Sequence, residues 1–282
     1  MKRNLMFFSL MLFSSLFAAD LSPREIIQRC IKRHGGQQNF DKIKNLYVKM
    51  DVHSKNEKAD VESLIEQYFR FPNKLRAEIS SMMNPPTKVS WNGKEAWQLT
   101  KNKLEKTKDP RQRDNLKESL RFVKLIMLTN LLEKDSTLKY EKHVKRKTYG
   151  IHVVSQTNKQ GEDIKIYIKD SDYSLFGGEF SWQGNNTIFK VFLDKQNYWV
   201  DGICFPREAR IYRGNEKVLD AKVRQIKINH LKNGNSFFTN LKEKPKMKKR
   251  GRTRRGRGGN KRTRQPRQYK KDDENKKNNE DD

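Results

Sequence analysis

The sequence contains few cysteines and few apolar residues. Only two of its 282 residues are cysteines, and apolar side chains make up 34% of the chain. Two cysteines are too few for a disulfide-dense scaffold. The low apolar content excludes a polytopic membrane protein, and 15 glycines are too few for a collagen-like repeat. A globular domain remains compatible with this composition, because the charge is unevenly distributed along the chain.

The sequence also lacks the short motifs that mark common catalytic sites. It contains no Gly-x-Ser-x-Gly, no His-Glu-x-x-His and no phosphate-binding loop, and no Gly-x-Gly-x-x-Gly follows a predicted strand. The five histidines are scattered, and no residue stands at metal-ligand spacing from either cysteine. His152, inside a predicted strand, is interpreted as a structural residue. We therefore expect a protein that is not an enzyme, with no cofactor and no metal site.

Acidic residues are too few to balance the basic ones, and the formal net charge is +28. Residues 242–282 carry 18 basic and 7 acidic side chains, a net of +11, and residues 1–241 carry the remaining +17. Low hydrophobicity combined with high charge predicts a disordered tail over 242–282. Residues 20–241 are long enough for one domain with a sizeable core.

The N-terminus has the pattern of a secretory signal peptide. Lys2 and Arg3 precede an apolar run from Leu5 to Phe17, and small residues follow it. The run is shorter than the roughly 20 residues that span a bilayer, so we expect cleavage near Ala19 and a soluble, exported, periplasmic protein. An uncleaved anchor is the alternative. Export to an oxidising compartment would allow Cys30 and Cys204 to pair, or each can be a small buried apolar residue.

Two amphipathic helices are predicted. Ser22 and Glu25 form a capping box around Pro23, and apolar residues at helical spacing extend the first helix over 23–34. Asp109-Pro110 begins a second helix over 110–132, whose C-terminal half is almost entirely apolar. A helix that is apolar on all sides is normally buried.

The rest of the chain is dominated by strand patterns. Alternating apolar and polar residues predict strands over 46–52, 61–71, 75–79, 87–91, 94–99, 151–155, 164–169, 180–182, 188–193, 198–200, 209–212 and 218–228. Asn92-Gly93 predicts a two-residue hairpin turn, which would place Trp91 opposite Lys94 and Val89 opposite Ala96. The expected fold is α+β: a strongly curved antiparallel sheet of about eleven strands, an open half-barrel enclosing two main helices.

The order of these elements resembles the periplasmic lipoprotein carriers, the LolA-like proteins of outer-membrane lipoprotein sorting. The resemblance covers about residues 21–240 and is carried by turn motifs: Pro72-Asn73, Asn92-Gly93-Lys94 with Trp97, and Asp201-Gly202 with Phe205-Pro206. It implies an incomplete barrel with helices as a lid over an apolar cavity that accepts acyl chains of lipoproteins or lipids. Carriers of this family have an arginine just before the Pro-Asn pair, which helps to close the lid; here Phe71 occupies that position and Arg70 precedes it.

Large, adaptable apolar residues are the expected lining of such a cavity. The predicted lipid-binding residues are Met50, Met82, Met83, Trp91, Trp97, Met127 and Phe189. Each is also compatible with an ordinary core position.

The basic tail allows three interpretations. Its arginines Arg250, Arg252, Arg254, Arg255, Arg257, Arg262 and Arg264 include a stretch close to an RGG repeat. Such segments bind nucleic acid, but the tail has a single aromatic residue and a signal peptide argues against this partner. They also bind anionic membranes or lipopolysaccharide. The third interpretation is a solvated tail with no dedicated partner.

The sequence therefore predicts a monomeric, exported binding protein that shelters acyl chains in lipoprotein sorting or envelope lipid transport. Two alternatives remain open. One is an interaction or stress-sensing module of the envelope on the same fold, which senses lipids or proteins without shuttling them. For a carrier, the expected protein partners are an envelope donor and acceptor. The other is polyanion binding through the tail.

Overall fold

The computed structural model describes residues 21–248, except for 57–58, 83–84, 129–130, 133–136, 158–162, 182–187 and 194–196. All described residues belong to one compact unit that ends at Lys248. This unit continues seven residues past position 241, because Leu231 pairs with Met247 in an isolated antiparallel bridge. The predicted signal peptide and the seven tail arginines lie outside the described residues.

Three α-helices are described: α1 (Pro23–Arg33), α2 (Gln37–Asp41) and α3 (Pro110–Met127), with a 3₁₀ turn η1 (Asn235–Phe238). The capping box of α1 is present, since the Glu25 N–H donates to Ser22 Oγ at 3.2 Å and the Ser22 N–H donates to Glu25 Oε2 at 2.8 Å. α3 ends at Met127, five residues before the predicted end, because the next residue, Leu128, has a φ of 55° that is incompatible with a continuing helix.

The described strands form one large sheet and one small hairpin. They are β1 (Asn45–Asn56), β2 (Ala59–Arg70), β3 (Lys74–Ser81), β4 (Thr87–Trp91), β5 (Ala96–Thr100), β6 (Lys103–Lys106), β7 (Thr137–Lys145), β8 (Gly150–Thr157), β9 (Asp163–Lys169), β10 (Leu175–Ser181), β11 (Ile188–Leu193), β12 (Asn197–Val200), β13 (Ile203–Pro206), β14 (Glu208–Arg213) and β15 (Glu216–Ile228). Within the described chain, the sheet order is β6-β5-β4-β3-β2-β1-β15-β14-β11-β10-β9-β8-β7, and β12 pairs with β13.

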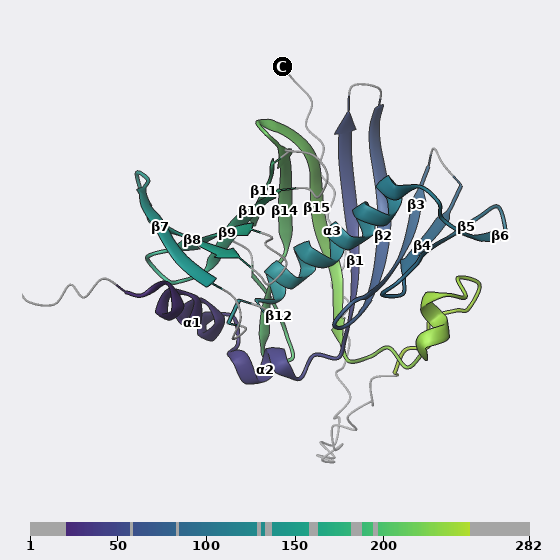
Figure 1. Ribbon diagram of the computed structural model, residues 1–282, viewed down its shortest axis with the longest axis horizontal. Coiled ribbons are helices and arrows are strands. Elements are labelled where there is room, and N and C mark those ends of the chain that lie inside the picture. The colour runs from purple at the N-terminus through teal and green to yellow at the C-terminus, as the bar shows by residue number, and fades with distance from the viewer. Residues whose placement is uncertain are drawn as a thin grey trace, which may run out of the picture. The chain divides into compact units, whose positions relative to one another are not determined.

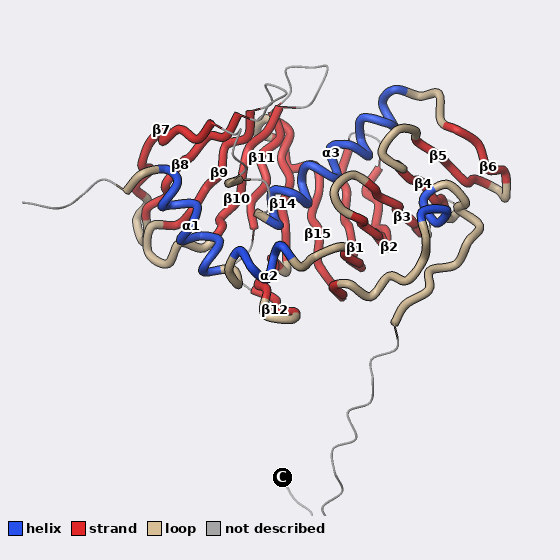
Figure 2. Tube along the Cα trace, turned by 60° about the horizontal axis from the view of Figure 1, so that its bottom comes forward, coloured by secondary structure: helices blue, strands red, loops and turns tan. Residues whose placement is uncertain are grey.

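The sheet is antiparallel throughout and is not closed into a barrel. Figure 1 shows α3 crossing one side of the sheet, and Figure 2 shows α1 on the same side over the β8–β10 half. We call this side the inner face and the opposite side the outer face. The predicted α+β half-barrel is confirmed, with more strands than the eleven expected.

The hairpin between β4 and β5 differs from its prediction. Trp91 pairs with Ala96 and Val89 with Gln98, so the connection contains four residues rather than two. The Asn92 N–H donates to the Glu95 carbonyl at 3.1 Å, and the Asn92 side chain accepts from two backbone N–H groups of the loop. An asparagine side chain that stabilises its own turn in this way competes with the two-residue alternative.

Elements that sequence analysis missed are short or lie at an edge. β6 and β7 are the two edge strands, and β7 is exposed along most of its length, so it lacks an apolar phase. α2 has only five residues. Periodicity is informative only where one face of an element is buried along several residues.

Two hydrophobic clusters hold the domain together, one on each face of the sheet. The larger one joins α1 and α3 to the inner face and includes Ile27, Phe69 and Met127, all fully buried. The smaller one lies on the outer face, where Phe237 and Phe238 pack against Tyr47 and Tyr68. The C-terminal segment (residues 231–248) therefore covers the outer face of β1–β4.

His34 fastens the C-terminal end of α1 to the sheet. Its Nε2 accepts the Leu175 N–H at 3.0 Å, so Nδ1 carries the proton and donates to the Cys204 carbonyl at 3.1 Å. Gly35 follows with a φ of +122°, and a Cβ there would lie 2.3 Å from the Gly202 carbonyl oxygen. Cys30 and Cys204 are both buried and free, so the optional disulfide is not formed. Burial raises the pKa of both thiols.

This junction makes stability depend on pH. Burial lowers the pKa of His34 below its usual value of about 6.5, against the weaker opposing effect of the Cys204 carbonyl. As the pH falls, His34 is therefore protonated in the unfolded chain before it is protonated in the folded chain. The stability that neutral His34 contributes is complete above about pH 6.5 and is lost as the pH falls below that value. Between pH 7.5 and pH 5.0, the free energy of unfolding measured by urea titration should decrease about 1 kcal/mol less in His34→Gln than in wild type. Equal losses of the free energy of unfolding in His34→Gln and wild type would contradict this role.

Candidate functional site

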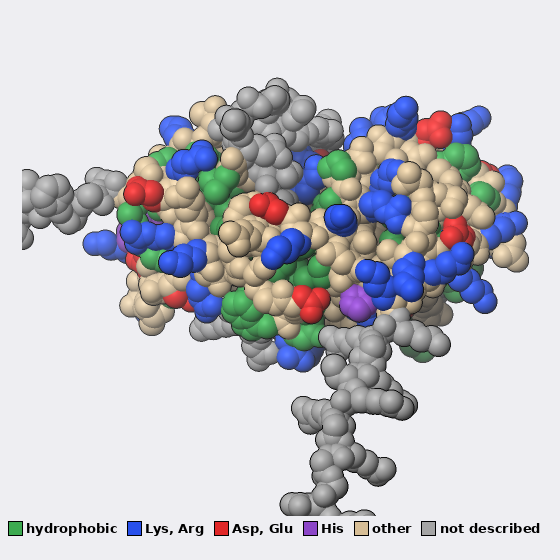
Figure 3. Space-filling model, turned by 90° about the horizontal axis from the view of Figure 1, so that it is seen from below, with side chains coloured by type: hydrophobic (Ala, Val, Ile, Leu, Met, Phe, Trp, Pro, Cys, Tyr) green, Lys and Arg blue, Asp and Glu red, His purple; other side chains and the backbone are tan. Residues whose placement is uncertain are grey.

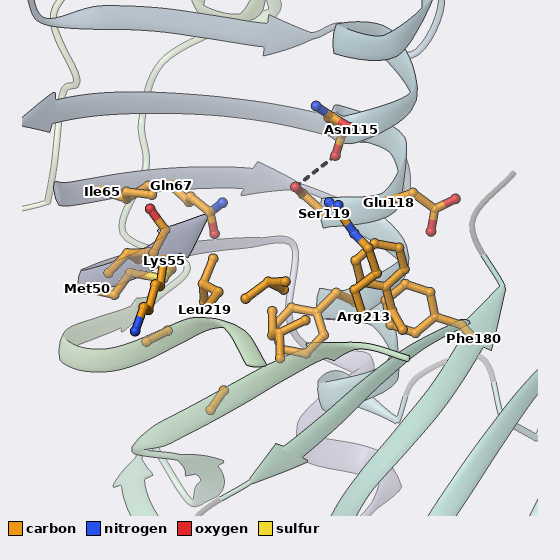
Figure 4. Close-up of a pocket in the computed structure, with 18 of the residues that line it drawn as sticks. Met50, Lys55, Ile65, Gln67, Asn115, Glu118, Ser119, Phe180, Arg213 and Leu219 are labelled. Carbon is orange, nitrogen blue, oxygen red and sulfur yellow. Dashed lines mark hydrogen bonds between the residues drawn. The ribbon is translucent and has the colours of Figure 1, made fainter. Parts of the chain in front are cut away.

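A cavity of about 710 Å³ lies between α3 and the inner face of the sheet. Its walls come from α3 and from residues of β1, β2, β10, β11, β14 and β15 (Figure 4). These strands are neighbours around the middle of the sheet, since β1 pairs with β2 and with β15. A volume of this size is within the range of about 300–1,000 Å³ that is usual for small-molecule sites.

The interior of the cavity is mainly apolar. Phe122 of α3 faces Met50 on the sheet side, while Phe180 and Phe189 stack at 6.1 Å to form one wall. Ala209 and Ala221 contribute only methyl groups to the floor, and they pair with each other in the sheet. Two small residues side by side on neighbouring strands leave open the space that larger side chains would fill.

A second, smaller cavity of about 60 Å³ adjoins this space beneath the C-terminal half of α3. The two share Met50, Phe122, Ala209 and Ala221 in their linings. Beyond these residues the smaller cavity is lined almost entirely by apolar groups, including Ile126, Met127 and Phe205. The two cavities together form a site whose innermost part is lined by apolar side chains.

Polar and charged groups gather mainly in the larger cavity, since Glu208 alone borders the smaller one. Those of the larger cavity are Ser54, Lys55, Gln67, Asn115, Glu118, Ser119, Arg213 and Glu216. Glu118 is 2% exposed and accepts from Arg121 Nη1 at 3.0 Å. Lys55, Arg213 and Glu216 are exposed, and Figure 4 shows Lys55 and Arg213 on opposite sides of Leu219. The site thus has a wet, charged mouth and a dry interior.

Three of the predicted lipid-binding residues line this site. Met50 borders both cavities, Phe189 borders the larger one and Met127 the smaller one. They come from β1, β11 and α3, which are far apart in the sequence. The structure therefore brings together residues that strand alternation and helix spacing placed on inner faces.

Trp91, Trp97 and Met82 do not line it. Trp91 is buried between the sheet and α3, with Lys117 Nζ 5.3 Å from its ring centroid. Trp97 pairs with Ser90, whose hydroxyl donates to the Phe238 carbonyl, so Trp97 lies on the outer face. Met82 is fully exposed beside a polar outer groove, and Met83 lies outside the described residues.

The two proposed lid residues lie away from the cavity. Phe71 stacks on Phe69 at 6.4 Å at the end of β2, and neither Phe71 nor Arg70 borders the larger cavity. Arg70 instead donates to the Asn233 carbonyl and to Asn235 Oδ1 on the outer face. Its side chain fastens the C-terminal segment to the sheet.

Sequence reasoning missed several lining residues: Ile65, Phe122, Phe180, Ile211, Arg213 and Leu219. Strand or helix patterns are compatible with burial of the apolar ones, but such patterns cannot separate a cavity wall from a filled core. That distinction depends on the neighbouring residues across strands, as with Ala209 and Ala221. Arg213 had no signal, because an arginine next to a turn is normally solvated.

Basic side chains are also frequent on one face of the surface (Figure 3). Figure 3 shows Lys and Arg side chains outnumbering Asp and Glu on the underside of the domain. Among the described residues, no helix is long and apolar enough to cross a membrane, and no cluster of His, Cys, Asp or Glu is arranged to hold a metal ion.

No protein-family model matches the sequence, and no curated protein matches it. Solved structures do match. A LolA superfamily protein from Nitrosomonas europaea aligns with a TM-score of 0.55 and 9% identity, over 79% of this chain and 100% of that chain. A DUF1329 family protein from Desulfovibrio piger aligns with a TM-score of 0.53 and 9% identity, over 79% of this chain and 99% of that chain. At this identity the likeness concerns the fold, and the domain that ends at Lys248 has the LolA-like fold.

Proposed function

We propose that this protein binds acyl chains of lipids or lipoproteins in the cavity under α3. The observation that carries the proposal is the combination of about 710 Å³ of open volume with an apolar interior between a helix and a sheet. An ordinary core in this position would be filled to crystal-like density. A charged mouth above a dry interior is the arrangement that an amphiphile needs.

The energetics of such binding are favourable. Each buried methylene contributes about 0.8 kcal/mol, so a few sheltered methylenes give usable affinity. Met50, Met127 and the phenylalanines of the wall adapt to chains of different length, because a thioether and a flat ring tolerate small displacements. Release remains possible, since the mouth stays open to solvent.

The biological setting follows from two further supports. The LolA-like fold is shared with a solved LolA superfamily protein, which favours lipoprotein sorting or envelope lipid transport as the process. The signal-peptide pattern of residues 1–19 favours a periplasmic location for the mature chain. A soluble carrier of acyl chains fits both.

A titration with the neutral fluorescent probe N-phenyl-1-naphthylamine tests the proposal. The mature chain should take up the probe saturably, and monoacylglycerols of 10, 12 and 14 carbons should displace it in that order. Each added buried methylene is expected to lower the Kd by up to about fourfold, which is the equivalent of about 0.8 kcal/mol. Linear uptake without saturation, or displacement that is independent of chain length, would reject the cavity as an acyl site and favour the interaction module.

A further inference from the structure

The mouth of the cavity contains more positive charge than its own carboxylates balance. Lys55 and Arg213 both border it, from the end of β1 and the end of β14. Within the described part of the chain, no ion pair within 4.0 Å involves either residue. Two exposed cations thus stand beside an apolar space without a local partner.

The acidic residues nearby do not cancel this charge. Glu118 is already occupied, because Arg121 lies 3.0 Å from its carboxylate. Glu216 is the cross-strand neighbour of Arg213 and borders the same cavity, yet the two form no ion pair. Asp60 is the cross-strand neighbour of Lys55, and its carboxylate lies 2.7 Å from His53 Nε2. Among the described residues that border the mouth, Lys55 and Arg213 therefore stand against Glu216, and none of the three forms an ion pair.

Arg213 is also held in a suitable place. Its guanidinium carbon lies 5.7 Å from the centroid of Phe189, and Figure 4 shows the side chain reaching from β14 toward α3. A ring beneath a guanidinium holds its plane without using its N–H donors. Those donors can bind the two oxygens of a carboxylate or phosphate in parallel, which a lysine cannot do.

We infer that the cavity takes amphiphiles with an anionic headgroup, whose oxyanion binds Arg213 at the mouth while the chain enters the apolar interior. Lys55, on the other side of Leu219 (Figure 4), adds to the positive potential of the mouth. This rests on the proposed function, because it names the class of acyl ligand. The recognised chemistry is a carboxylate or phosphate oxyanion on a single acyl chain. A fatty acid and a lysophospholipid both supply it.

Competition between ligands of equal chain length tests the inference. Palmitate, 1-palmitoyl lysophosphatidic acid and monopalmitoylglycerol, each below its micelle-forming concentration, displace N-phenyl-1-naphthylamine from the full mature chain. Both anions are expected to bind about tenfold more tightly than the neutral glyceride. Tighter binding of palmitate than of the lysophospholipid would identify the carboxylate as the preferred oxyanion. Tighter binding of the lysophospholipid would identify the phosphate.

Variants locate the effect. Arg213→Gln should reduce anion binding about tenfold and leave monopalmitoylglycerol unchanged. Arg210→Gln is the matched control, because Arg210 lies on the same strand with its side chain beside the outer groove. Equal affinity for all three ligands in wild type, or equal losses in the two variants, would overturn the inference and leave the acyl site intact. Failure of all three ligands to compete would instead reject the proposed function.

Discussion

Replacing Arg76 by leucine is expected to lower the free energy of unfolding by about 3–5 kcal/mol. The Arg76 side chain is completely buried on the outer face, beneath the C-terminal segment. It donates to Glu78 Oε1 at 2.7 Å and to the carbonyls of Phe237 and Leu241 at 3.1 Å each. Its guanidinium carbon also lies 4.0 Å from the Phe237 ring centroid. Leucine would leave two carbonyls without a donor and a carboxylate without its closest cation.

Urea unfolding followed by circular dichroism measures this loss. Arg224→Leu is the control, since Arg224 forms an ion pair with Asp51 on the exposed surface. Exposed pairs contribute about 0–1 kcal/mol, so the control should unfold close to wild type. Similar midpoints for the two variants would show that the C-terminal segment is not fastened through Arg76.

A tryptophan in place of Ala221 is expected to abolish acyl binding while the fold is retained. Ala221 lies on the floor shared by both cavities, so an indole there would occupy the space that the chain needs. We expect the affinity for N-phenyl-1-naphthylamine to fall more than tenfold, because the buried apolar area of the ligand is lost. Overpacking is expected to reduce stability by about 1–3 kcal/mol, which thermal unfolding would reveal separately.

Lys222→Trp is the matched control for this substitution. Lys222 is the next residue of β15 and alternates to the outer face, where it lies 3.8 Å from Glu208. It introduces the same indole without entering the cavity. Unchanged binding in Ala221→Trp, or equal loss in both variants, would place the probe elsewhere on the protein.

Local patterns were sufficient for much of the fold. The capping box at Ser22 and Glu25 and the alternation from Leu46 to Val52 each specify an element through contacts within a few residues. The order of strands in the sheet could not be predicted in this way. β1 pairs with β2 and also with β15, and β15 is separated from β1 in the sequence by most of the domain. Pairing between distant strands depends on the whole set of buried faces rather than on one segment.

The candidate site was only partly predictable for the same reason. Met50 lies in the apolar phase of the alternation from Leu46 to Val52, and this was visible in the sequence. The strand of Phe189 has apolar residues in both phases, so its orientation depended on the neighbouring strands. Met82 follows the end of β3, where alternation no longer fixes a side chain, and it is exposed. The burial of Arg76 depends on residues 237–241, about 160 positions later, and no local pattern shows a charge satisfied by such distant carbonyls.

Native mass spectrometry of the mature chain, secreted from a bacterial host and purified without detergent, tests the central claim most directly. We expect a retained adduct with the mass of an acyl lipid, present in Lys222→Trp and absent in Ala221→Trp. A chain truncated after Lys248 should retain the same adduct, since the cavity is formed by residues before that point. An adduct that persists in Ala221→Trp, or a wild-type protein that remains unliganded even after addition of palmitate and monopalmitoylglycerol, would contradict the account.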